Sequence, residues 1–262
     1  MSMLIARLGA CGLLTIAGSL FAHDPVFAPG PHTLFKGGIE LHLGSERVQD
    51  DAAVDKAGEL SLLYGITGDW VAGVQIPYAY GDSGHGFEST TLLTKYRFWR
   101  NDRPRVQESA ALLARVILDS GQVRSGATDA VLGLTYGYES LTWYRWAAAR
   151  YRYNGETDAG VDRGDVLLLD AVIGVRPRRL EYRAPDSVWM LELNYERQAR
   201  ARASGAAVPD TGGARLFLSP GLMWTWRNLA VKPGVQIPVW GDLNGAQRNP
   251  DYRALIEVEL HL

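Results

Sequence analysis

Apolar and polar residues alternate along most of the chain. Leu60, Leu62 and Tyr64, for example, share one parity, while Glu59 and Ser61 occupy the other. Successive side chains of a β-strand point to opposite faces, so this period of two predicts strands with one apolar face. The predicted strands span residues 33–46, 57–66, 69–80, 87–99, 107–119, 127–138, 141–153, 163–176, 186–197, 213–227, 229–240 and 251–262. No composition break separates them, which indicates one domain.

The connections between these strands differ in length in an alternating way. The first, third, fifth, seventh, ninth and eleventh are long and polar, whereas tight turns are predicted around Gly68-Asp69, Glu139-Ser140 and Asn228. Two even-numbered connections, RNDRPRVQ and RPRRLEYRAPDS, are longer than this rule prefers. Outer-membrane barrels have an even number of strands, long outer loops and short periplasmic turns. We therefore predict an all-β fold, a twelve-stranded antiparallel up-and-down transmembrane β-barrel with both termini in the periplasm.

Aromatic residues gather near both ends of the predicted strands. Near the proposed periplasmic turns are Trp70, Phe98, Trp99, Tyr136, Tyr138, Tyr144, Trp224 and Trp226, and near the proposed outer loops are Tyr80, Tyr151, Tyr153, Tyr195, Trp240 and Tyr252. Two aromatic bands are typical of a barrel crossing both membrane interfaces. Aromatic residues are also common in strands generally, so this observation supports the barrel without proving it.

The stretch GVQIP occurs at residues 73–77 and again at 234–238, in two strands that we expect to run outward. The alternation directs the valine and isoleucine of each copy to lipid, and Gln75 and Gln236 to the interior. Proline removes one ladder hydrogen bond, which is tolerable near the end of a strand. The repetition fits two strands under the same constraint as well as it fits a duplication.

The first 22 residues carry Arg7, an uncharged apolar stretch and a small residue, Ala22, before His23. This pattern predicts a cleaved secretory signal peptide over 1–22, followed by an N-terminal periplasmic segment over 23–32 and the barrel over 33–262. Cleavage would remove Cys11, the single cysteine, so no disulfide is expected. The near balance of 27 basic and 29 acidic residues argues against a nucleic-acid partner.

Charged residues on the parity opposite to lipid define the candidate lumen, because charges facing lipid are costly. The predicted basic lining is Lys95, Arg97, Arg115, Arg145, Arg215, Arg227 and Lys232, and the predicted acidic lining is Glu40, Glu59, Asp170, Glu192, Glu196, Glu257 and Glu259. Basic residues concentrate on the fourth, fifth and seventh strands, and acidic ones at the seam between the last strand and the first two. Separated by water, these walls would orient small solutes. Paired across the interior, they would seal a barrel with a structural or partner-binding role.

The sequence contains neither GxSxG nor HExxH, and we expect no enzyme activity and no cofactor. A barrel-embedded lipid hydrolase is the enzymatic alternative, but such an enzyme uses lipid-facing His and Ser, whereas the alternation places His42 and His261 inside. Cleavage after Ala22 would give His23 a free amine. That amine and the imidazoles of His23 and His32 form a candidate metal site.

The stretch HDPVFAPGPHTLFKGGIELHL, from His23 to Leu43, resembles the mature start of bacterial outer-membrane transporters related to the meta-pathway of phenol degradation proteins. The resemblance implies an outer-membrane channel for small solutes, with aromatic compounds or metal-related solutes suggested, surrounded by lipid and inserted by the barrel assembly machinery. Leu262 departs from the terminal aromatic residue of many such barrels. Residues 24–31, rich in Pro and Gly, join a ladder with difficulty. We expect them to enter the periplasmic mouth as a plug.

Overall fold

The computed structural model describes residues 24–50, 53–82, 84–177 and 184–262. Their strands are β1 (Ile39–Gln49), β2 (Val54–Thr67), β3 (Trp70–Gly81), β4 (Gly84–Phe87), β5 (Thr91–Arg103), β6 (Val106–Ile117), β7 (Asp129–Ser140), β8 (Trp143–Tyr153), β9 (Val161–Asp162), β10 (Val166–Val175), β11 (Asp186–Gln198), β12 (Arg202–Ala203), β13 (Ala206–Ala207), β14 (Gly213–Trp226), β15 (Leu229–Leu243) and β16 (Tyr252–His261). The predicted signal peptide and His23 lie outside the described residues. No helix in the described residues is long and apolar enough to cross a membrane.

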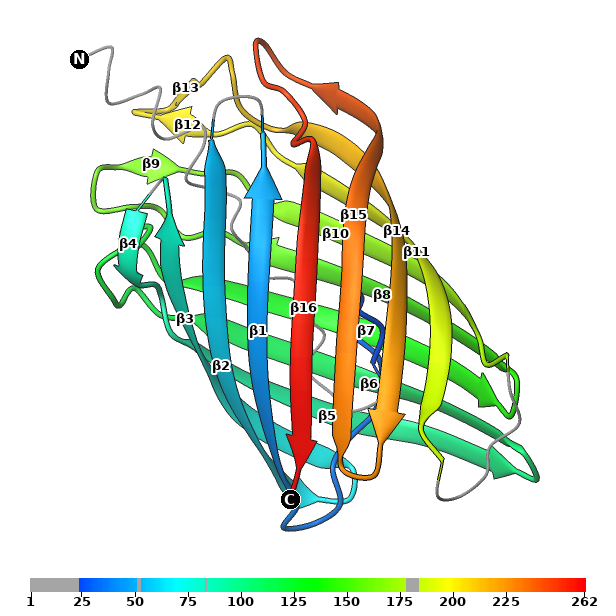
Figure 1. The fold of residues 1–262 in the computed structure, drawn as a ribbon. Coiled ribbons are helices and arrows are strands. Elements are labelled where there is room, and N and C mark those ends of the chain that lie inside the picture. The colour runs from blue at the N-terminus through cyan, green and yellow to red at the C-terminus, as the bar shows by residue number, and fades with distance from the viewer. Residues whose placement is uncertain (1–23, 51–52, 83, 178–183) are drawn as a thin grey trace.

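The long strands form a closed barrel of 12 antiparallel strands, which confirms the predicted fold. Each long strand pairs with the long strand before it in the chain, and β1 pairs with β16 from Glu40↔His261 to Gln49↔Tyr252 to close the ring (Figure 1). Closure leaves the long strands without an unpaired edge. The short strand β4 pairs antiparallel with the end of β3, while β9, β12 and β13 form a small separate sheet.

The two ends of the barrel differ, and we name them by their connections. The turn rim carries the links β2–β3, β5–β6, β7–β8, β10–β11 and β14–β15, and the loop rim carries the other links together with β4, β9, β12 and β13. Arg105 and Arg227 lie in two-residue turns at the turn rim with φ of 67° and 56°. Positive φ is what tight hairpin turns require. The connection expected to be RNDRPRVQ is thus a tight turn, because β5 and β6 continue to Arg103 and from Val106.

The first strand begins later than predicted. The alternation suggested a start at residue 33, but β1 begins at Ile39. Gly37 has a φ of 81°, and Gly38 N donates to the Phe35 carbonyl at 2.9 Å. A turn therefore occupies this stretch, and the chain enters the ladder only after it.

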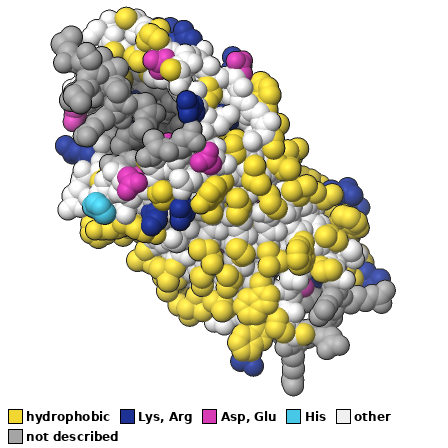
Figure 2. Space-filling view, turned by 45° about the horizontal axis from the view of Figure 1, so that its top comes forward, with side chains coloured by type: hydrophobic (Ala, Val, Ile, Leu, Met, Phe, Trp, Pro, Cys, Tyr) yellow, Lys and Arg dark blue, Asp and Glu magenta, His cyan; other side chains and the backbone are white. Residues whose placement is uncertain are grey.

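The outward face of the barrel is apolar. Leu60, Leu62 and Tyr64 are exposed on β2, while Leu63 between them is buried inside. Figure 2 shows hydrophobic side chains over the outer wall, with charged side chains mainly toward its ends. Tyr144, which was predicted in the aromatic band near the periplasmic turns, faces the interior instead of lipid. It is buried and stacks on Trp146, with ring centroids 5.3 Å apart.

Candidate functional site

The N-terminal segment (residues 24–38) is drawn in blue in Figure 1. Residues 24–31 are buried inside the ring of strands, and the chain then leaves the barrel at the turn rim before β1 begins. Glu192, on the inner face of β11 and fully buried, accepts backbone N–H bonds from Val26 at 2.8 Å and from Ala28 at 2.9 Å. Phe27 N also donates to both carboxylate oxygens, at 3.2 and 3.3 Å. One carboxylate thus satisfies three consecutive peptide groups that would otherwise be buried without partners.

A second set of contacts joins this segment to β5. Lys95 Nζ lies 2.9 Å from Asp24 Oδ2 and donates to the Gly30 carbonyl at 2.6 Å, with both charged side chains buried. A Cβ atom on Gly30 would lie only 2.2 Å from Asp24 Oδ1, so a larger residue here would displace the Asp24 carboxylate. Lys95 is therefore inside, as predicted, but its charge is paired with the N-terminal segment.

Apolar packing also holds the N-terminal segment inside the barrel. Val26, Phe27 and Ala28 belong to one buried cluster with residues of β8, β10, β11, β14 and β16. Gly221 and Gly234 make room for them, because a Cβ atom on either would lie 2.7 or 2.8 Å from Val26. Burial of these side chains removes apolar surface from water and favours the seated segment.

Near the turn rim, His32 contacts Glu139 at the end of β7, and Trp146 Nε1 donates to the same carboxylate at 3.2 Å. Burial opposes protonation of His32, but the Glu139 carboxylate outweighs it and raises the pKa of His32 above its ordinary value. His32 thus has a carboxylate partner, and a metal site with His23 stays a prediction.

In the two GVQIP copies the glutamines have the same role, whereas the glycines have different ones. Gln75 and Gln236 are both buried on the inner face, where Gln75 Nε2 donates to Glu59 at 2.6 Å and Gln236 Nε2 donates to Asn194 at 3.1 Å. The glycines differ, since Gly73 makes room for Leu63 and Gly234 for the N-terminal segment.

The predicted acidic seam is a compact network of opposite charges. Lys232 Nζ lies 2.8 Å from Glu257 and also contacts Glu259, and all three side chains are buried. His42 contacts Glu40 and lies 3.3 Å from Glu257, while His261 Nδ1 lies 3.3 Å from Glu40. We call these six residues the seam network. Glu40, Glu257 and Glu259 of the expected acidic wall thus each contact a lysine or a histidine, and His42 and His261 face inward.

Between the N-terminal segment and the loop rim, a polar network lies on the inner faces of β8, β10, β11, β14, β15 and β16. Arg150 lies 2.8 Å from Asp170, whose other oxygen accepts from Asn194 at 2.9 Å. Arg253 binds both oxygens of Glu196, at 2.7 and 3.3 Å. Asp170 and Glu196 are therefore inside, as predicted. Glu59, also inside, accepts from Ser61 at 2.8 Å.

Two predicted lining residues are wrong. Arg145 is exposed on the outer face, with its guanidinium 5.4 Å from the Tyr138 ring centroid, and Arg150 takes the inner position on that strand. Arg227 lies in the β14–β15 turn, 5.0 Å from the Trp226 ring centroid. The β7–β8 hairpin could have predicted the inner face of β8. Its two-residue turn pairs Glu139 with Tyr144, so these two residues point to the same face of the sheet.

The remaining basic residues lie inside but in different settings. Arg97 is buried at the turn rim, where its Nε and one terminal nitrogen donate to Asp69 at 2.9 and 2.7 Å. Arg115 lies on the inner face of β6 and is partly exposed, and Arg215 is buried near the loop rim. Arg253 was missed, although it shares the parity of Glu257 and Glu259 on the last strand.

The comparisons with known proteins agree with this architecture. Similar solved structures include the COG4313 outer membrane channel from Pseudomonas putida F1, with a TM-score of 0.73 at 10% identity, over 93% of this chain and 100% of that one. The chain has the fold of an outer-membrane β-barrel. The NanC porin follows with a TM-score of 0.51 at 12% identity, over 86% of this chain and 100% of that one, and the KdgM porin with 0.50 at 12%, over 84% and 98%.

No family model matches the chain, and no curated protein matches it either. Membership of the phenol-degradation transporter family therefore rests on the N-terminal resemblance alone. The structural likenesses support the broader group, outer-membrane barrels.

Proposed function

We propose that the protein is an outer-membrane channel for small polar solutes, closed by residues 24–32 of its own chain. The observation that carries this proposal is the seating of the N-terminal segment by the Glu192 carboxylate inside a closed barrel. The segment is not a strand of the barrel, so its release would leave the β-ladder intact. The resemblance of the N-terminal stretch to phenol-degradation transporters adds aromatic compounds and metal-related solutes as candidate solutes.

The polarity of the wall supports a barrel that lies in lipid and has a polar interior. The outer face is apolar and suits lipid, whereas the inner face carries Arg150, Asp170, Asn194 and Arg253 in hydrogen-bonded networks. Buried charges without such partners would be costly, so the pairing stabilises charges inside the barrel. Pairing alone would also suit a sealed barrel, and the conductance test below decides between the two. We place the loop rim outside the cell and the turn rim in the periplasm, as outer-membrane barrels have them, with insertion by the barrel assembly machinery.

The test is the conductance of the refolded mature protein in planar bilayers, beside a deletion of residues 24–31. We expect the wild type to be mostly closed and the deletion to give large, long-lived conductance steps. A matched deletion of residues 202–209, at the loop rim, should leave closure unchanged. Folding of each protein is checked by its heat-modifiable gel mobility. A folded deletion variant that stays silent would contradict the channel and favour a sealed barrel with a structural role.

A further inference from the structure

Part of the seam network has the donor set of a metal site. Glu40, Glu259 and His261 each offer one ligand atom, and these three atoms lie within 4.8 Å of one another. Glu40 is on β1 and the other two residues are on β16, where the register places His261 directly opposite Glu40. Imidazole nitrogen and carboxylate oxygen are both ligands that Zn²⁺ takes in proteins.

Two of these ligands are buried and have an oxygen atom without a hydrogen bond. Glu40 and Glu259 are fully buried, and the Oε2 atom of each has no hydrogen-bond partner among the described residues. His261 Nδ1 lies 3.3 Å from Glu40 Oε2 without forming a hydrogen bond to it. Two ligands that each lie about 2.0–2.1 Å from one tetrahedral ion are about 3.3–3.4 Å apart, so this nitrogen and this oxygen already have the spacing of neighbouring ligands. Buried oxygen atoms in this state favour an incoming cation.

The seam network also has more negative than positive charge. It contains three carboxylates, and Lys232 is the lysine that contacts two of them. Even with His42 protonated, the six residues carry one more negative charge than positive charges when His261 is neutral. A divalent cation supplies positive charge at this point, and a neutral imidazole offers it a lone pair.

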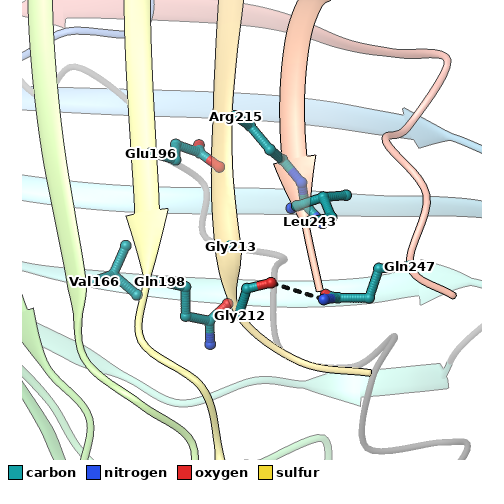
Figure 3. Close-up of a pocket in the computed structure, with 8 residues that line it drawn as sticks. All are labelled: Val166, Glu196, Gln198, Gly212, Gly213, Arg215, Leu243 and Gln247. Carbon is teal, nitrogen blue, oxygen red and sulfur yellow. Dashed lines mark hydrogen bonds between the residues drawn. The ribbon is translucent and has the colours of Figure 1, made fainter. Parts of the chain in front are cut away.

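Two other places inside the barrel suit a cation less well. A second set of close ligand atoms consists of His42 and the two glutamates that Lys232 contacts, but all of these side chains are buried and the lysine already lies against both carboxylates. In the pocket near the loop rim, Arg215 and Glu196 line the wall together, so the positive charge of one offsets the negative charge of the other (Figure 3). The set that includes His261 is therefore the better candidate.

His261 gives this set a route to solvent. Its side chain is 27% exposed and lies at the turn rim. Asn228, in the β14–β15 turn, holds its backbone: His261 N donates to the Asn228 carbonyl at 2.9 Å, and Asn228 Nδ2 donates to the His261 carbonyl at 3.1 Å. The imidazole is thus fixed at the end of the last strand, between solvent and the two buried carboxylates.

We propose that Glu40, Glu259 and His261 bind one Zn²⁺ ion, which enters from the turn rim and takes water as its fourth ligand. The ligands come from the first and last strands of the barrel, so the complete site exists only after β1 has paired with β16. Bound Zn²⁺ therefore stabilises the closed barrel, because it binds the folded state and not the unfolded one. The site requires no open lumen and does not depend on the proposed function.

The test is isothermal titration calorimetry with ZnCl₂ on the folded mature protein in detergent, after treatment with EDTA and removal of the chelator. Every protein carries His23→Ala and His32→Gln, which remove the candidate metal ligands near the N-terminus. We expect saturable binding of one Zn²⁺ ion per barrel. In this parent protein Zn²⁺ should also raise the temperature at which heat-modifiable gel mobility is lost.

Three variants of this parent protein locate the site. His261→Gln and Glu259→Gln each remove one ligand and should weaken Zn²⁺ binding by at least about tenfold, since loss of a group that only orients a ligand already costs about 10–100-fold. Either variant suffices if the other does not fold. The matched control is His85→Gln, at an exposed position on β4 at the loop rim, which should leave binding unchanged.

A folded parent protein that binds no Zn²⁺ would overturn the proposal, as would a folded His261→Gln protein that binds Zn²⁺ as tightly as its parent. Zn²⁺ binding that leaves the temperature of the mobility change unaltered would contradict the bridge between β1 and β16. These outcomes are independent of conductance, so the metal site and the channel can fail separately.

Discussion

Replacement of Glu192 by glutamine should loosen the N-terminal segment without changing the barrel. The carboxylate accepts from three consecutive peptide N–H groups, at 2.8 Å from Val26, 3.2 Å from Phe27 and 2.9 Å from Ala28. A glutamine keeps one carbonyl oxygen but places its NH₂ group against one peptide N–H, and it converts the remaining charge-assisted bonds into weaker neutral ones.

The magnitude follows from these contacts. Loss of one hydrogen bond to a charged acceptor costs about 1.5–3 kcal/mol, and weakening of the others adds to it. Burying a neutral amide beneath the segment costs less than burying a carboxylate, which offsets part of the loss. We therefore expect the seated state to lose ~2 kcal/mol relative to the released state, which is roughly a 30-fold shift in the equilibrium.

The assay is the single-channel open probability of Glu192→Gln in planar bilayers at one voltage and salt concentration. The matched control is Glu46→Gln, the same chemical change at a buried position on the inner face of β1. Glu46 Oε2 has no hydrogen-bond partner among the described residues, so its replacement should leave closure unchanged. A folded Glu192→Gln protein with the open probability of the wild type would refute the role assigned to this carboxylate.

Two further predictions concern charge pairs. Lys232→Met removes the lysine of the seam network and leaves the buried carboxylates of Glu257 and Glu259 without it, which should lower the free energy of unfolding by about 3–5 kcal/mol. The temperature at which heat-modifiable gel mobility is lost should fall accordingly. The control Lys36→Met, at an exposed position, should not change this temperature. Because Glu139 raises the pKa of His32 despite burial, their ion pair is complete below about pH 6.5 and is lost as the pH rises through the raised pKa. Open probability should then rise with pH in the wild type and less steeply in His32→Gln, and equal slopes in both proteins would exclude this pair as the cause.

Much of the wall could be predicted from local pattern because a strand exposes alternate residues to opposite faces. Leu60, Leu62 and Glu59 fall on the predicted faces. The error at Arg145 came from a register that alternation cannot determine, whereas Arg227 lies in a turn beyond the end of its strand. On β8 both parities contain aromatic and small residues, so Arg145 and Arg150 could be exchanged, and only pairing with β7 decides between them.

The candidate site was less predictable, because its contacts join residues far apart in the chain. The pairing of Asp24 with Lys95 spans 71 positions, and the bond from Val26 to Glu192 spans 166. Proline and glycine in residues 24–31 indicated a segment unsuited to the hydrogen-bond ladder of a β-sheet. Its sequence does not indicate which residues of the barrel it contacts.

Alternating strands, long and short connections, and charges directed away from lipid all follow from the amino-acid pattern, since they depend on the two-residue period of a strand. Which charges meet depends instead on the closed barrel. Closure of β1 on β16 brings His42 against Glu257 and Glu40 against His261, while contacts across the interior pair Lys95 with Asp24 and Arg253 with Glu196. Strand stagger and side-chain reach set the pairing inside a barrel, and neither is encoded in the spacing of residues along one strand.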